Sequence, residues 1–133
     1  MNSVFLDTVG LIAIWERTDQ WHQVATEAFE RILANRVRII TTTYVLIECA
    51  NSASRRPYRS FVDPMRNNLV ELGGLVFPTD EDWQAVWDEY RTGKPGTPGI
   101  VDLMSFRVMR NRGLTDAFTN DRHFREAGFN PLF

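Results

Sequence analysis

The chain has 133 residues, of which 44% are hydrophobic and 24% are charged, and its net charge at pH 7 is −2. These values are typical of a globular domain with its own core, and the charge gives no general attraction to nucleic acid. We find no apolar run of about 18 residues and no basic-then-apolar leader, so we expect neither a membrane span nor a signal peptide. The single cysteine, Cys49, excludes an internal disulfide and favours the reducing cytoplasm.

The first third of the chain predicts two strands separated by helices. Val4–Leu6 is a short apolar run that favours a buried parallel strand, and Val9–Glu16 follows it as a short helix. Asp19 is expected to cap a longer helix over Gln20–Ala34, and Arg36–Thr42 reads as a second strand. The apolar stripe expected along the longer helix consists of Trp21, Val24, Ala28 and Ile32.

Helical patterns dominate the middle of the chain. Thr43–Asn51 and Tyr58–Leu69 are predicted helices, and Leu72–Phe77 is predicted to be a third strand. A further amphipathic helix should begin at Thr79 or Asp80, both of which are good capping residues.

The last third begins with a loop rich in glycine and proline, Thr92–Gly99. Ile100–Arg112 is apolar on almost every side, which predicts a helix buried nearly all round. A strand over Leu114–Thr119, a helix over Asp121–Ala127 and an edge strand within Phe129–Phe133 complete the chain.

This alternation of strands and helices predicts an α/β fold with a mostly parallel central sheet flanked by helices. We expect one domain over residues 1–133, because the glycine- and proline-rich loop is followed by too few residues for a second domain.

Four acids share one feature: each ends or interrupts an apolar segment. They are Asp7, Glu48, Asp102 and Asp121. In an open parallel sheet, functional groups gather beyond the carboxyl ends of the strands near a topological switch point, so we expect these acids to converge there. Gathered carboxylates repel one another unless a cation neutralises them, and oxygen-only ligands favour Mg²⁺ or Mn²⁺. Such a site is suited to metal-assisted hydrolysis of phosphodiesters.

An alternative for each acid is a purely structural role, as a helix cap or as the partner of an arginine. Asp121 in particular stands where an N-cap is expected. His22 and His123 have no metal-binding spacing with Cys49, so zinc is not expected.

Smaller polar residues accompany the acids. Ser105, Thr119 and Asn51 are hydrogen-bonding side chains near an acid, where they would orient carboxylates or metal-bound water, although caps and turns are alternative roles. Asp116 is a fifth acid, expected on an exposed turn beside the site.

Arginines gather after the third predicted helix, at Arg55, Arg56 and Arg59. They predict either a solvated helix face or a groove that contacts a nucleic-acid backbone or a protein partner.

The chain resembles the PIN domain family, and within it the VapC-type toxins of bacterial toxin–antitoxin pairs. The resemblance spans essentially the whole chain and rests on four motifs. These are F-L-D-T near the N-terminus, T-x-x-L-I-E ending at Glu48, V-D-L-M-S-F-x-V-M-R from Val101 to Arg110, and A-F-T-N-D-R-H-F-R-E-A-G-F from Ala117 to Phe129. The last two motifs are the specific part.

The resemblance implies a Mg²⁺- or Mn²⁺-dependent endoribonuclease that leaves 5′-phosphate and 3′-hydroxyl ends. The family acids fall on the same four positions, the supporting hydroxyl falls on Thr119, and Ser105 lies on the helix after the third acid. It also implies an RNA substrate, a cognate antitoxin over the acidic groove and a possible homodimer. Val9 departs from the pattern, since relatives often carry a small hydroxylated residue there.

Two alternatives stay open at this point. One is a stand-alone PIN nuclease for RNA maturation or DNA cleavage. The other is a PIN-like binding module without catalysis.

Overall fold

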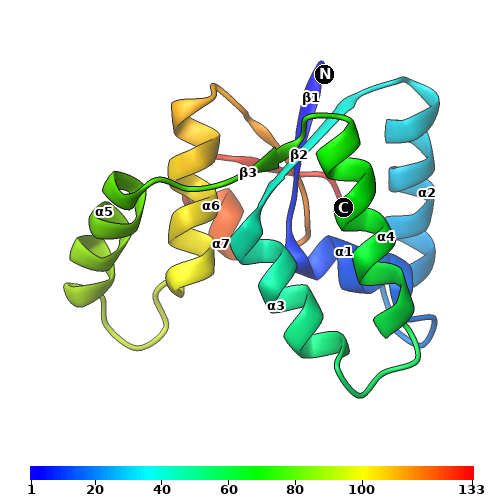
Figure 1. The fold of residues 1–133 in the computed structure, drawn as a ribbon, viewed down its shortest axis with the longest axis horizontal. Coiled ribbons are helices and arrows are strands. Elements are labelled where there is room, and N and C mark those ends of the chain that lie inside the picture. The colour runs from blue at the N-terminus through cyan, green and yellow to red at the C-terminus, as the bar shows by residue number, and fades with distance from the viewer.

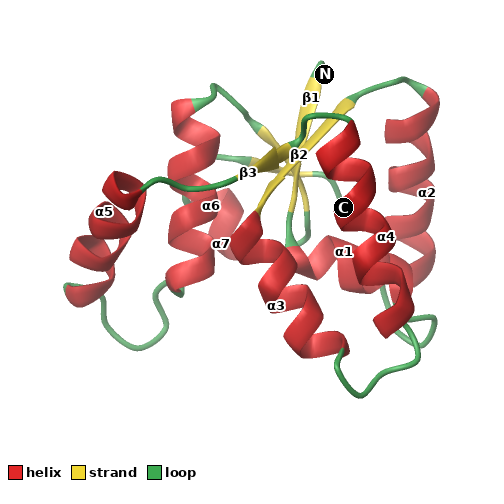
Figure 2. Cartoon of the chain, in the orientation of Figure 1, coloured by secondary structure: helices red, strands yellow, loops and turns green.

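The computed structural model describes residues 1–133 as a parallel sheet between helices. The strands lie in the middle of the molecule, with helices on either side (Figure 2). The sheet has five strands in the order β3-β2-β1-β4-β5, and every neighbouring pair is parallel. The elements are β1 (Ser3–Leu6), α1 (Thr8–Trp15), α2 (His22–Ala34), β2 (Arg38–Thr42), α3 (Thr43–Ala53), α4 (Arg59–Glu71), β3 (Leu75–Val76), α5 (Asp80–Arg91), α6 (Ile100–Asn111), β4 (Asp116–Phe118), α7 (Arg122–Glu126) and β5 (Asn130–Pro131).

The central strand, β1, marks the point at which the chain reverses its direction across the sheet. The chain runs outward from β1 to β2 and β3, and later crosses back to place β4 and β5 on the other side (Figure 1). Phe5 stands opposite Ile40 on β2 and Ala117 on β4. Because the strand order reverses between β1 and β4, a crevice is expected beyond their carboxyl ends.

A close contact between α1 and β4 shapes this crevice. A Cβ atom on Gly10 would lie 2.2 Å from the backbone oxygen of Phe118, so only glycine fits there. The same oxygen accepts a hydrogen bond from Asp7 N at 3.4 Å. The start of α1 is therefore held directly against the end of β4.

The prediction for α2 is wrong at its first turn. The helix begins at His22, and the Asp19 carboxylate instead accepts a hydrogen bond from Trp21 N at 2.8 Å in the preceding turn. Trp21 and Val24 are 42% and 45% exposed, whereas Ala25 is buried. The buried stripe is Ala25, Ala28 and Ile32, because small residues let α2 pack closely on α1.

The third strand is shorter than predicted. Gly73 and Gly74 end α4 instead of starting β3: Gly74 N donates to Leu69 O at 2.8 Å, and Gly73 has a φ of 70°. Phe77 is exposed beyond the strand. The backbone conformation of this glycine pair is that of the C-terminal end of α4.

The last third of the chain follows its prediction closely. The segment from Thr92 to Gly99 is a loop, and α6 buries Leu103, Met104, Phe106 and other side chains around its circumference. The expected edge strand is β5. Figure 1 places α5 at the outer edge of the molecule, where it packs on α6. None of the helices is both long and apolar enough to cross a bilayer.

Replacing Gly10 with alanine should destabilise the fold, because the added methyl group has to displace β4 or α1. We expect a loss of about 2–3 kcal/mol in the free energy of unfolding, measured by urea titration. Gly99→Ala is the control for an added methyl that meets no atom within 4 Å, and it should cost less, about 1 kcal/mol, because Gly99 is the N-cap of α6. Equal stability of the two variants would show that the α1–β4 contact is not a constraint.

Candidate active site

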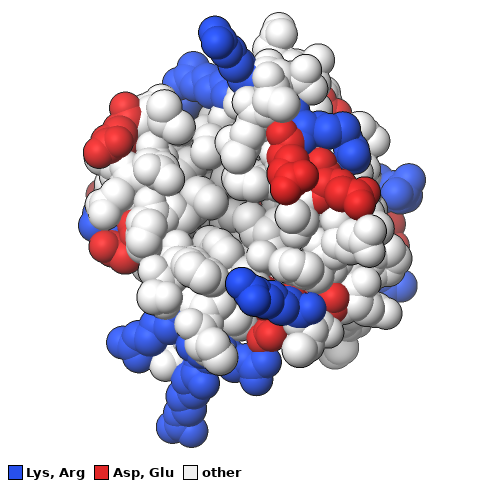
Figure 3. Space-filling view, turned by 90° about the vertical axis from the view of Figure 1, so that its right-hand side faces the viewer, with Lys and Arg blue, Asp and Glu red and all other residues white.

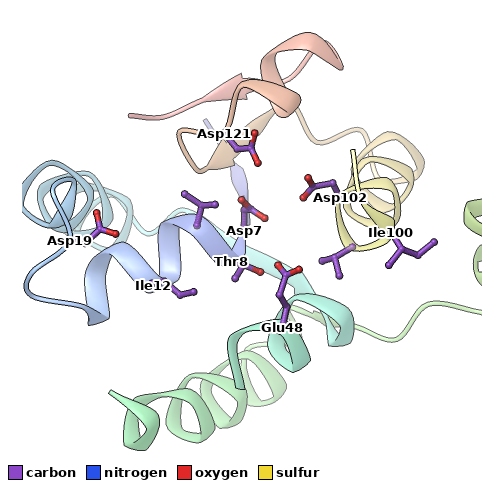
Figure 4. A pocket seen from close by; sticks show the side chains of 11 residues that line it. Asp7, Thr8, Ile12, Asp19, Glu48, Ile100, Asp102 and Asp121 are labelled. Carbon is purple, nitrogen blue, oxygen red and sulfur yellow. The ribbon is translucent and has the colours of Figure 1, made fainter. Parts of the chain in front are cut away.

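The four acids predicted from the sequence line one pocket at the switch point of the sheet. The pocket has a volume of about 430 Å³. Figure 4 shows the carboxylates of Asp7, Glu48, Asp102 and Asp121 pointing into a common space from different elements. The lining residues are Asp7, Thr8, Val9, Ile12, Asp19, Glu48, Gly99, Ile100, Val101, Asp102 and Asp121.

Two of the acids are tied together through Thr119. Its hydroxyl donates a hydrogen bond to Asp7 Oδ2 at 2.8 Å and accepts one from Asp121 N at 3.1 Å. Asp7 follows β1 and Thr119 follows β4, so the register of these strands brings the residues together. Asp121 Oδ1 accepts from His123 N at 2.9 Å and thereby caps α7. The predicted capping role of Asp121 is confirmed, and one carboxylate oxygen remains for the pocket.

The other two acids come from α3 and α6, two helices that contact each other. Glu48 lies in the middle of α3, which Thr42 caps by accepting a hydrogen bond from Val45 N at 3.2 Å. Asp102 lies in the first turn of α6. Both helices begin near the rim, so their acids reach the pocket from its walls.

None of the four acids forms a salt bridge. The ion pairs of the chain involve other acids, as in Arg56–Glu16 and Arg107–Asp82. Asp7 occupies the N-cap position of α1, yet its side chain makes no capping hydrogen bond. Pairing with arginine therefore explains none of the four positions, and capping explains only Asp121.

Burial and mutual repulsion disfavour the ionised forms of two of these acids. Asp7 is 1% exposed, and burial followed by repulsion from Asp102 raises its pKa to about 7, although the Thr119 hydrogen bond opposes the shift. Burial and repulsion from Asp121 and Glu48 raise the pKa of Asp102 to about 6. The acids thus feel one another's charge across the pocket.

The donor set fits a hard divalent cation. The pocket is lined by five carboxylates and by no lysine, arginine or histidine, and oxygen donors of this kind bind Mg²⁺ and Mn²⁺. The hydroxyl of Thr8 is also buried in the pocket wall without a hydrogen-bond partner. In the arrangement seen, no three acids lie close enough to hold one ion together.

The predicted supporting residues occupy different places. Thr119 contacts Asp7 and Asp121, as described above. Ser105 is buried, but its hydroxyl donates to the backbone oxygen of Val101 at 3.0 Å instead of to an acid. Asn51 faces a neighbouring hollow.

Asp116 does not lie beside the pocket. It begins β4, at the end of that strand opposite to Thr119, and its carboxylate accepts a hydrogen bond from Asn130 Nδ2 at 2.8 Å. The sequence-based placement of this acid next to the site is therefore wrong.

Two polar lining residues were not recognised from the sequence. Thr8 follows Asp7 directly, so its position after a strand end was an available signal. Asp19 is predicted to cap a helix, but it lies in the turn before α2 and reaches the pocket from there. Nothing in its local sequence indicates this second position.

The predicted arginine group lies outside the pocket. Arg56 is bound to Glu16, and Arg59 Nη1 donates to Ser54 O at 2.9 Å. Arg55 is exposed. Figure 3 shows basic side chains gathered at the lower end of the face that carries α2, while uncharged surface covers its middle. Contact of these arginines with RNA or with a protein partner stays a prediction.

The raised pKa of Asp7 predicts that the metal-free protein loses stability as the pH rises. The folded state keeps the Asp7 proton to about pH 7, whereas the unfolded chain releases it near 3.8. Between pH 5 and pH 8 the free energy of unfolding should therefore fall by about 2–3 kcal/mol from this group alone. Urea titrations in a chelating buffer measure this change.

Asp7→Asn should reduce this pH dependence and should be more stable than the parent at pH 8. The amide carries no charge that burial disfavours, and its oxygen can still accept the hydrogen bond from Thr119. Asp80→Asn, at an exposed position on α5, is the control and should keep the parent's pH dependence. If Asp7→Asn and the parent lose stability in parallel with pH, the buried carboxylate is not the cause.

Comparison with known proteins agrees with this architecture. The model of the PIN domain family matches residues 4–130. The crystal structure of VapC20 from Mycobacterium tuberculosis, a Sarcin-Ricin loop cleaving toxin, superposes with a TM-score of 0.74 at 24% sequence identity and covers 96% of each chain. No curated protein matches the sequence. The fold of this chain is thus that of a VapC toxin, and the family match shows that the chain belongs to the PIN domain family.

Proposed function

We propose that the chain is a metal-dependent endoribonuclease that hydrolyses RNA phosphodiester bonds and acts as the toxin of a VapBC-type toxin–antitoxin pair. The observation that carries the proposal is the pocket lined by Asp7, Glu48, Asp102 and Asp121, none of which has a basic partner. Membership of the PIN domain family and the fold shared with VapC20 support it.

The charge of the pocket supports dependence on a cation. A phosphodiester is anionic, and a pocket of carboxylates without a basic side chain repels it. Asp7, Glu48, Asp102 and Asp121 are the residues expected to hold Mg²⁺ or Mn²⁺. A bound divalent ion of this kind neutralises the phosphate and makes a water molecule more acidic.

The chain's own contribution is the placement of the acids. Thr119 fixes one oxygen of Asp7 and the backbone of Asp121, so these two carboxylates are oriented before any ligand binds. Glu48 and Asp102 approach from α3 and α6, which lets them adjust around the ligand. Attack of water on the phosphorus, with cleavage of the bond from phosphorus to O3′ and protonation of O3′, would leave a 5′-phosphate and a 3′-hydroxyl.

The proposal extends to partners and location. We expect a cognate antitoxin that covers the acidic pocket, a possible homodimer, and activity in the cytoplasm, where RNA substrates occur. The cysteine is buried and free, in agreement with a reducing compartment. Toxin activity in VapC20, which shares the fold, supports the toxin assignment.

Asp102→Asn should abolish RNA cleavage while the fold persists, because it removes one carboxylate from the pocket and relieves repulsion within it. We expect growth arrest on induced expression to disappear, and new 5′-phosphate RNA ends to fall by about 100-fold or more. Sequencing of 5′-phosphate ends measures this loss. Asp80→Asn should behave like the parent, and cleavage by Asp102→Asn at the parent's rate would refute the assignment.

Mn²⁺ should stabilise the purified protein without RNA. A ligand that binds only the folded state adds about 2.7 kcal/mol at a concentration 100 times its dissociation constant. We expect the melting temperature to rise with Mn²⁺ for the parent and to stay constant for Asp7→Asn/Asp102→Asn. A parent that shows no rise at millimolar Mn²⁺ would instead favour a module without metal chemistry.

A further inference from the structure

A second hollow adjoins the acidic pocket and shares two residues with it. The hollow has a volume of about 360 Å³ and lies between α3, α5 and α6. Glu48 and Val101 line both cavities, so the two lie side by side and share a wall. The lining residues are Tyr44, Ile47, Glu48, Asn51, Ser52, Trp83 and Val101.

The walls of this hollow combine aromatic rings with small polar groups. Tyr44 and Trp83 pack edge to face, with ring centroids 6.1 Å apart and an interplanar angle of 76°. Trp83 also contacts Trp87, with centroids 5.8 Å apart, so its ring is held from both sides. Even so, Trp83 is 51% exposed. A large aromatic ring that is fixed in orientation and open to solvent is suited to stacking on a planar ligand.

The charge of the hollow favours a neutral ligand. Glu48, on the wall shared with the acidic pocket, is its only ionisable group apart from the phenol of Tyr44. Asp82, the acid on α5 that lies near Tyr44, is bound to Arg107 Nε at 2.7 Å. A phosphate group therefore has no partner here, whereas a nucleobase has apolar faces for the rings and polar edges for Asn51 and Ser52.

We propose that this hollow binds the nucleobase next to the scissile phosphate. The proposal rests on the nuclease function proposed above, because the acidic pocket then receives the phosphate while the adjoining hollow receives the base of the same nucleotide. A base in a continuous duplex is stacked and paired and cannot enter such a hollow, whereas an unpaired base can be splayed out and stacked on an aromatic side chain.

Nucleotide binding tests the proposal without knowledge of the natural target. The ligands are AMP, GMP, CMP and UMP, compared with ribose 5-phosphate, which lacks a base, all in the presence of Mn²⁺. We expect the preferred nucleotide to bind the parent about 5- to 100-fold more tightly than ribose 5-phosphate, the range that corresponds to one base stacked on an aromatic ring. Isothermal titration measures both affinities.

The variants separate Trp83 from the rest of the aromatic row. Trp83→Leu should remove the preference for a nucleotide over ribose 5-phosphate, and Trp83→Phe should keep most of it. Tyr90→Leu is the matched control, since Tyr90 lies two turns beyond Trp83 on α5, packs on Trp87 and does not line the hollow. Thermal melting of each variant establishes that it is folded.

Three results would overturn the base site: equal binding of nucleotides and ribose 5-phosphate by the parent, an unchanged preference in Trp83→Leu, or an equal loss in Tyr90→Leu. A change from dimer to monomer in Trp83→Leu with the preference intact would assign the hollow to contact between copies of the chain. Failure of the nuclease proposal looks different, because binding of ribose 5-phosphate would then not depend on Mn²⁺.

Discussion

A buried carboxylate with one hydroxyl partner organises this molecule. Asp7 is almost fully enclosed at the end of the central strand, and its only side-chain hydrogen bond comes from Thr119, 112 residues further along the chain. That contact exists because Leu6 pairs with Phe118, which places the residues after the two strands side by side. Gly10 contributes by allowing α1 to lie against the Phe118 carbonyl. The alignment of β1 with β4 thus determines the positions of Asp7, near the N-terminus, and Asp121, near the C-terminus.

The same arrangement costs stability, and this cost indicates function. Burial and mutual repulsion oppose the ionisation of Asp7 and Asp102, and no arginine or lysine compensates them. A purely structural role would be served better by neutral residues, since a buried unpaired charge stabilises nothing. The protein keeps a group of acids whose mutual repulsion is relieved by protonation or by a positively charged ligand. Strain of this kind is typical of binding and catalytic sites.

Local sequence patterns predicted most of the fold and the four principal acids, because strand ends and apolar contexts are visible in the chain itself. They did not show where small polar side chains direct their hydrogen bonds. Ser105 is satisfied by the carbonyl four residues before it, as serine often is within a helix. Asp116 begins β4 and Thr119 follows its last residue, so the two side chains lie beyond opposite ends of a strand that rises about 3.3 Å per residue.

The remaining differences between prediction and structure concern which way Asn51 faces on α3 and where α2 begins. Asn51 follows Glu48 by three residues, which places it on nearly the same side of α3, yet it lines the hollow next to the acids. Trp21 was expected in the buried stripe because the helix was predicted to begin at Gln20. The turn formed by Asp19 places the first residue of α2 at His22, so Trp21 precedes the helix. These outcomes depend on tertiary contacts and on turn geometry that local periodicity does not encode.

Two adjoining cavities of opposite character suggest how one site can choose a substrate. The acidic pocket would select for charge, since its carboxylates repel an anion that no cation accompanies. The aromatic hollow selects for a planar and largely apolar group, since its walls offer rings and small polar side chains. Because Glu48 and Val101 belong to both, a ligand that fills both cavities must present a phosphate and a flat ring within one nucleotide of each other. Unpaired RNA meets that requirement, whereas a duplex keeps its bases inside the helix.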